Sequence, residues 1–285
     1  MTLVVGRVTG QQVRILSDFL VTNPEMPQTS PLSGVLKAVI LQPELCVCLA
    51  GRVAPALEAI REVERSLGGG IDDALTLLLD AHRVSDAETD FLVGEMEPPR
   101  LHRITGGHIE RDLLAAHIGD SGAFSRYQEL YATPPPWPSF PFFDEPADQK
   151  AARLMSDAFD ALLREASFPT VGGFTILAAS GTSFGAGFTY LPRWWGQGFA
   201  PVSGPGPKSL LTPVSQEEGG YYYTILTPTV TGIGAIGAYF PQPQLGALFF
   251  PVKEDGPRLY RSVTCDEFRD RVRGEFGFEL SGVLM

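Results

Sequence analysis

Short β-rich segments that come in pairs constrain the fold of this chain more than any other feature of its sequence. The segments 2–8 and 13–17 flank one short turn, and the segments 36–41 and 45–50 flank another that contains Pro43. Pairs separated by turns this short predict antiparallel hairpins. Paired strands interrupted by helices fit two β-layers with helices stacked against them better than alternating βαβ units. The sequence therefore predicts an α+β fold.

Helical periodicity separates these strand pairs. Apolar residues spaced three and four apart from Val53 to Leu67 indicate an amphipathic helix, and a run of three glycines ends it. Further helices are predicted over 72–82 and 151–166. Strands are predicted over 90–96, 101–104, 115–118, 174–179 and 184–191.

The chain changes character after about residue 192. Residues 219–252 carry no charged side chain, but four prolines and six glycines interrupt this run. Such punctuation favours buried strands, which we place at 221–226 and 245–252, over a membrane-spanning helix. A final amphipathic helix is predicted around 266–274.

We therefore divide the chain into two domains. Residues 1–192 hold the strand pairs and the first helices, and residues 193–285 form a β-rich C-terminal extension that ends in a helix. No internal repeat of fixed period is present.

The overall charge excludes several classes of function. The 285 residues have a formal net charge of −11, so no basic surplus is available to replace the counterions of a nucleic acid. Hydrophobic residues make up 44% of the chain, which is too apolar for intrinsic disorder. The N-terminus lacks a basic region followed by a long apolar one, so we expect a cytoplasmic protein with no membrane anchor.

Neither the cysteines nor the glycines predict a metal or a cofactor. Three cysteines cannot build a disulfide framework in a chain of this length, and Cys46-x-Cys48 without a second cluster is a poor zinc signature. The glycines 232, 234 and 237 have the spacing of a dinucleotide fingerprint. No clear strand precedes them and no helix follows, so close strand packing is the simpler interpretation.

One lysine stands out because of its surroundings. Lys37 lies in an otherwise apolar segment that is predicted to be a buried strand. A buried ammonium group without a partner is costly, so we expect Lys37 to pair with a carboxylate, and Asp18 on the adjacent strand is the candidate.

An ordered set of spacings includes both residues. Asp18 follows Thr2 by sixteen residues, and Gly51, in an Ala-Gly pair at a strand end, follows Lys37 by fourteen. Farther on, the segment 116–122 contains a Gly-Asp-Ser-Gly turn with Ser121. Taken one at a time these residues also fit structural roles, as strand, turn or surface residues.

Together the set resembles the proteasome β subunits and the bacterial HslV peptidase, which are N-terminal-nucleophile (Ntn) hydrolases. The resemblance covers roughly residues 2–192 and implies a four-layer αββα sandwich for that part of the chain. It also implies a homo-oligomer that acts on a peptide or amide substrate without a cofactor or metal.

The same resemblance implies a threonine-type hydrolase. Thr2 would be the nucleophile once Met1 is removed, and its free α-amine would be the base. Lys37 and Asp18 would adjust the charge beside it, the N–H of Gly51 would stabilise an oxyanion, and Ser121 would position the amine or a water.

Departures from the family pattern leave a second interpretation open. Val171 stands where the family has a serine before a Gly-Gly pair, and no aspartate precedes it at the usual distance. Glu165 or Thr170 could substitute only after a local rearrangement. The alternative is a catalytically silent scaffold or interaction protein, for which the aromatic and proline-rich stretch 133–146 could serve as an interface.

Overall fold

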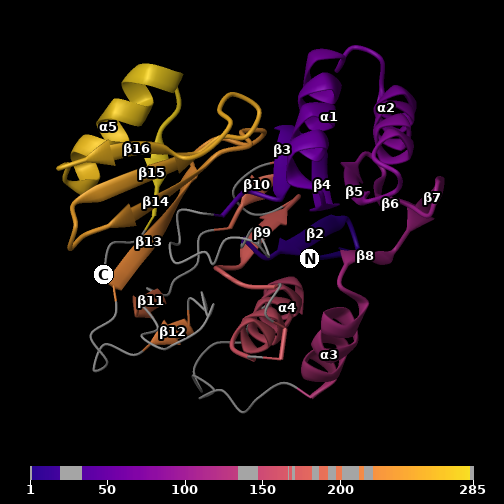
Figure 1. Cartoon of the computed structure of the whole chain (residues 1–285), viewed down its shortest axis with the longest axis horizontal. Helices are drawn as coiled ribbons and strands as arrows, with labels where there is room; N and C mark the ends of the chain where they lie inside the picture. The colour runs from indigo at the N-terminus through magenta and orange to yellow at the C-terminus, as the bar shows by residue number, and fades with distance from the viewer. Residues whose placement is uncertain are drawn as a thin grey trace.

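Two five-stranded antiparallel sheets form the first part of the molecule (Figure 1). The first contains, in spatial order, β10 (Thr189–Tyr190), β9 (Ile176–Ala179), β2 (Gln12–Ser17), β1 (Leu3–Thr9) and β8 (Ala115–Gly119). The second contains β3 (Ala38–Gln42), β4 (Leu45–Gly51), β5 (Thr89–Met96), β6 (Pro99–Thr105) and β7 (His108–Leu113). This computed structural model describes residues 2–19, 34–133, 147–165, 167–168, 171–181, 186–191, 197–200, 212–214 and 221–282.

Apolar side chains from both sheets fill the space between them. Val4 and Ile15 of the first sheet and Ile40, Cys48 and Leu92 of the second belong to one buried cluster. Because side chains alternate across a strand, the neighbours of these residues point to the outer faces of the sheets. Each sheet therefore needs a second cover on its outer face.

Helices supply those covers, as Figure 1 shows. On the second sheet, Ile60 of α1 (Val53–Arg65) and Leu78 of α2 (Ile71–Val84) pack in one cluster with Val47. On the first sheet, α3 (Ser121–Ala132) and α4 (Ala147–Leu163) pack through a third cluster. Antiparallel sheets with helices against their outer faces confirm the α+β class.

A third sheet dominates the C-terminal part. It contains, in order, β12 (Thr212–Val214), β11 (Gln197–Ala200), β13 (Tyr221–Pro228), β14 (Ile236–Phe240), β15 (Leu245–Phe249) and β16 (Arg258–Arg261), with β17 (Leu280–Ser281) paired to β13. Phe268 of α5 (Cys265–Phe276) lies in a buried cluster with Tyr239 and Leu248 on one face of this sheet. Its other face contributes Phe240 and Phe249 to the cluster between the first two sheets.

The two parts of the chain thus share one core. Within the described residues, the C-terminal part contains the third sheet and α5, and the short strand β17 follows the helix that was predicted to end the chain. The domain boundary near residue 192 lies outside the described residues and stays a prediction, as does any role for the stretch 134–146.

In the sandwich, two elements were not predicted, and in the C-terminal part the strands β11, β12, β14, β16 and β17 were not placed individually. The strand β7 has the sequence HIERDL and is largely exposed at the edge of its sheet, so it lacks the apolar alternation that marks a half-buried strand. The helix α3 buries only Ala123 and Tyr127, so its apolar stripe is too narrow to be recognised. The predicted strand 245–252 ends at Phe249, because the N–H groups of Lys253 and Glu254 both donate to the carbonyl of Phe250 in a tight turn.

The fingerprint-like glycines have a packing role. Gly232 and Gly234 lie between β13 and β14, and a strand, not a helix, follows them. A Cβ atom on Gly234 would come within 2.2 Å of the carbonyl oxygen of Ile40 in β3. This close approach brings the third sheet against the sandwich, and strand packing is confirmed as the reason for the motif.

Gly234→Ala is expected to lower the free energy of unfolding by about 1–3 kcal/mol, because the added methyl group overpacks a contact with backbone. Urea denaturation of both variants measures this against Gly68→Ala, a site where an added Cβ meets no atom within 4 Å. The control should change stability by less than about 0.5 kcal/mol. Equal effects of the two changes would contradict the close-packing argument.

Candidate active site

Backbone hydrogen bonds fix Thr2 at the beginning of β1. Its carbonyl accepts from the N–H of Asp120 at 2.8 Å, and the next N–H, of Leu3, donates to Asp18 Oδ1 at 3.0 Å. Gly119 has a φ of +95°, and a Cβ on it would lie 1.8 Å from the carbonyl oxygen of Thr2. Only glycine allows β8 to pass this close, and Thr2 itself is 4% exposed.

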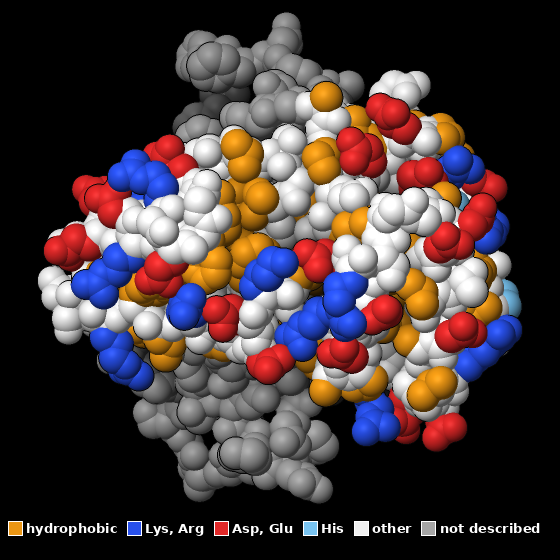
Figure 2. Space-filling view, turned by 90° about the horizontal axis from the view of Figure 1, so that it is seen from above, with side chains coloured by type: hydrophobic (Ala, Val, Ile, Leu, Met, Phe, Trp, Pro, Cys, Tyr) orange, Lys and Arg blue, Asp and Glu red, His pale blue; other side chains and the backbone are white. Residues whose placement is uncertain are grey.

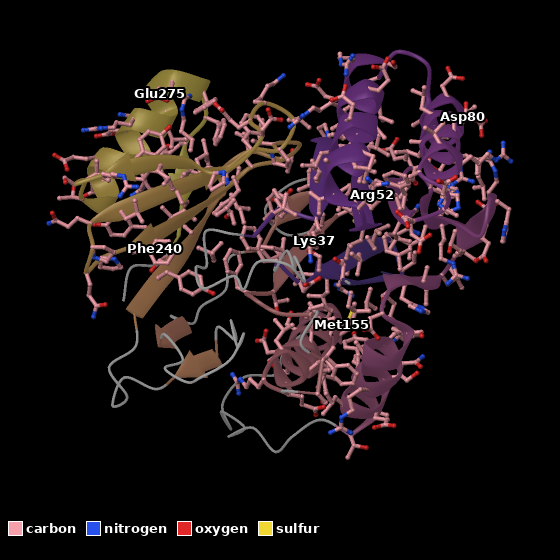
Figure 3. All side chains as sticks on the ribbon, viewed as in Figure 1. Lys37, Arg52, Asp80, Met155, Phe240 and Glu275 are labelled. Carbon is pink, nitrogen blue, oxygen red and sulfur yellow. The ribbon has the colours of Figure 1, made fainter. Side chains whose placement is uncertain are left out.

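Asp18 and Lys37 form a fully buried ion pair next to Thr2. Lys37 Nζ lies 2.7 Å from Asp18 Oδ2, and both side chains are 0% exposed. The N–H of Gly172 also donates to Asp18 Oδ2, at 3.3 Å. Figure 3 shows Lys37 near the middle of the molecule, between the sandwich and the C-terminal sheet. The expected pairing of the lysine with Asp18 is confirmed.

Burial acts on both members of this pair. It raises the pKa of the Asp18 carboxyl above its ordinary value, although Lys37 and the N–H groups of Leu3 and Gly172 oppose the shift. Burial likewise lowers the pKa of the Lys37 ammonium, against the attraction of Asp18. Desolvation thus acts on the two pKa values in opposite directions and brings them toward each other.

Gly51 lies where β4 ends and α1 begins, as predicted. Its φ is +92°, and a Cβ would come within 1.9 Å of the carbonyl oxygen of Glu88, so glycine is required for structural reasons alone. Arg52 is the N-cap of α1 and offers no side-chain cap. The partial positive charge of a helix N-terminus is therefore present beside Gly51.

The ends of the two sheets meet at this point. A Cβ on Gly119 would be 3.5 Å from Cβ of Ala50, the residue before Gly51. The strand end that carries Gly51 is therefore close to the strand end that holds Thr2. The structure joins Asp18 and Lys37 in one ion pair, and Asp18 accepts from the N–H of Leu3, the residue directly after Thr2. Gly51 lies at the neighbouring strand end.

Ser121 is placed differently. It is the exposed first residue of α3, and the residue that contacts Thr2 is its neighbour Asp120, through the backbone N–H. The carboxylate of Asp120 caps the helix by accepting from the N–H of Ala123 at 2.9 Å. Sequence reasoning missed this role, although an aspartate before Ser-Gly-Ala is a recognisable N-cap signal.

Gly172 is the second residue whose role was missed. It binds Asp18 only through its N–H, so no side-chain motif reveals the contact. The neighbouring Val171 is buried in the cluster beneath α3 and α4 and supplies no hydroxyl. Glu165 is bound to Arg126, 2.7 Å away, and does not join the site, whereas Thr170 lies outside the described residues.

Among the described residues, no group of three or more His, Cys, Asp or Glu side chains could hold a metal ion. Over the same residues, none of the helices has the length and apolar character needed to cross a bilayer.

No protein-family model matches the chain, and no curated protein sequence does either. Among solved structures, the chain is similar to the crystal structure of eukaryotic HslV from Trypanosoma brucei. The likeness has 16% sequence identity and a TM-score of 0.44, and it covers 62% of this chain and 98% of that one. A likeness at this level assigns the chain to no family.

Removing either member of the Asp18–Lys37 pair is expected to lower the free energy of unfolding by about 3–5 kcal/mol, because the other charge stays buried without its partner. Asp18→Asn and Lys37→Met test this by urea denaturation. The double variant should be more stable than the sum of the two losses predicts, since it leaves no lone charge.

Arg111→Ala is the matched control, because Arg111 and Asp72 form an equally short but exposed ion pair, at 2.6 Å. Its loss should cost less than about 1 kcal/mol. Strictly additive effects of the two buried changes would contradict the coupling.

Proposed function

We propose that this chain is a threonine amidohydrolase or peptidase of the Ntn type, with Thr2 as its nucleophile after removal of Met1. The supporting observation is the buried Asp18–Lys37 pair, which is hydrogen-bonded to the main chain directly after Thr2. A buried charge pair is often less stable than apolar residues of similar volume. Its presence at a strand end therefore favours a catalytic role over a purely structural one. We also propose the four-layer αββα Ntn architecture for the sandwich.

The proposed reaction begins when Thr2 Oγ attacks the carbonyl carbon of an amide. The hydroxyl proton passes to the free α-amine of Thr2, the C–O bond forms, and the carbonyl π electrons move to oxygen. The C–N bond then breaks, and the leaving amine takes the proton from the α-ammonium. Water attacks the resulting ester by the reverse proton path, which releases the carboxylic acid and restores the Thr2 hydroxyl.

The other residues would act on charges in this reaction. Lys37 would stabilise the developing alkoxide on Thr2. Asp18 would hold the lysine in place and favour its protonated form. The N–H of Gly51, beside the N-terminus of α1, would stabilise the oxyanion. Ser121 would hold a water or the α-amine only if its exposed side chain turned toward Thr2.

The remaining expectations complete the proposal. The substrate would be a peptide or another amide, and the protein would act without a cofactor or metal as a cytoplasmic homo-oligomer. The net charge of −11 favours neither nucleic acid nor an anionic surface as a partner.

A catalytically silent scaffold is the second candidate function. Val171 brings an apolar side chain where the family has a hydroxyl, and Thr2 is almost fully enclosed. Without the hydroxyl that the family has at the position of Val171, an enclosed Thr2 would have only a structural role.

The proposed function predicts that a threonine-directed electrophile, such as a β-lactone, labels Thr2. Intact mass spectrometry should first show protein that lacks Met1, and then one added acyl group per chain. Thr2→Ser should retain labelling, because it keeps a hydroxyl, and Thr2→Ala should lose it. Lys37→Met should slow labelling by about 100-fold or more, the usual range for a lost proton-transfer or charge-stabilising group.

Thr9→Ala is the matched control, since Thr9 is an exposed threonine at the opposite end of β1. It should be labelled as fast as the wild-type protein. Absence of labelling in protein with a free Thr2 would refute the hydrolase and favour the scaffold.

A further inference from the structure

We propose that residues 250–257, the loop between β15 and β16, are a latch that closes the candidate active site. This regulation of the site rests on the function proposed above, whereas the attachment of the loop to α1 is observed in the structure. The latch belongs to the C-terminal sheet and is fastened to α1 of the sandwich, so it connects the two parts of the chain at the surface.

Arg61 of α1 is the main fastening. Its guanidinium donates to the carbonyl oxygens of Pro251 at 2.9 Å and Glu254 at 3.2 Å, and it pairs with Asp255 at 2.8 Å. One planar group thus holds three positions of a single turn, which is geometry that arginine provides and lysine does not. A second ion pair, Lys253 to Glu64 at 3.0 Å, fastens the same turn three residues farther along α1.

The latch continues an aromatic contact that reaches the site. Phe249, the residue before it, packs edge-on against Phe19 with ring centroids 4.6 Å apart, and Phe19 follows Asp18 directly. Phe19 in turn stacks on Phe174 at 4.0 Å. Its N–H donates to the carbonyl of Gly172, the residue that also binds Asp18. A displacement of Phe249 would therefore move Phe19 and the backbone next to the Asp18–Lys37 ion pair.

A cavity of about 270 Å³ lies behind the latch. Its inner wall is formed by residues 34–36, which lead into Lys37, and by Val53 and Leu57 at the start of α1, just beyond Gly51. Its outer wall is formed by the latch and Phe249. The cavity wall thus includes Leu36, which directly precedes Lys37, and Val53, which follows Gly51 by two positions.

Figure 2, which views the molecule from the side of α1, α2 and α5, shows hydrophobic side chains gathered in the middle of the face and charged groups around them. Exposed ion pairs are weak and are screened by salt, whereas the apolar walls favour closure. A latch built this way can open locally without unfolding the core.

A cysteine placed in the cavity wall measures the opening. In Leu57→Cys protein, the rate of alkylation by iodoacetamide reports how often the cavity is open. Adding Arg61→Ala should raise that rate about tenfold, the effect of one lost charge-assisted hydrogen bond. The matched control is Arg65→Ala, because Arg65 lies one turn farther along α1 and pairs with Glu58 and Glu62 of its own helix. It should leave the rate unchanged.

The native cysteines report global unfolding, because Cys46, Cys48 and Cys265 are all buried. If Arg61→Ala also exposes the native cysteines, a charge exchange between Lys253 and Glu64 distinguishes local opening of the latch from global unfolding. Lys253→Glu should accelerate alkylation of the cavity cysteine, and adding Glu64→Lys should reverse the acceleration. Equal rates in the Arg61 and Arg65 variants, or no response to the charge exchange, would overturn the latch.

Electrophile labelling of Thr2 in the same variants separates the latch from the proposed function. Faster labelling in parallel with faster alkylation supports a latch that controls a working site. Faster alkylation with no labelling of any variant supports the latch and refutes the hydrolase. Labelling at one rate in every variant overturns control by the latch and leaves the hydrolase intact.

Discussion

The ion pair between Lys37 and Asp18 is the interaction on which the rest of the structure depends. Its charges lie at the junction of the two sheets, with no exposure to solvent. Such a pair is tolerable only if every charged atom has a partner, and the N–H groups of Leu3 and Gly172 provide two of them. The beginning of β1, the end of β2 and the segment before β9 are therefore held in one arrangement, and Thr2 is held with them.

Two glycines allow the close backbone contacts around the ion pair. Gly119 lets β8 pass directly over the carbonyl of Thr2, and Gly51 lets the end of β4 approach Glu88. Both need a backbone conformation with positive φ, at +95° and +92°. The C-terminal sheet packs against the sandwich through the close approach of Gly234 to Ile40 and through Phe249 in the shared core.

Much of this could be predicted because it depends on local patterns. The hairpins, three of the helices in the sandwich and the uncharged C-terminal strands follow from apolar periodicity and turn residues, and the need of Lys37 for a carboxylate follows from its apolar neighbours. The strand β7 and the helix α3 escaped prediction because they bury too few side chains to show a period. The contact of Gly172 with Asp18 escaped because a backbone N–H leaves no mark on the sequence.

The sequence by itself determined the α+β class, the positions of the strongly periodic strands and helices, and the types of side chain available for chemistry, because these depend on neighbours along the chain. Only the tertiary structure decided that the backbone N–H of Asp120 binds the carbonyl of Thr2 and that Arg126 binds Glu165. It also decided that Arg61 binds the carbonyls of Pro251 and Glu254, which lie 190 and 193 positions farther along the chain. These contacts join segments far apart in sequence. They depend on how the sheets are stacked, and stacking is set by the complementary shape of whole faces, which no local pattern records.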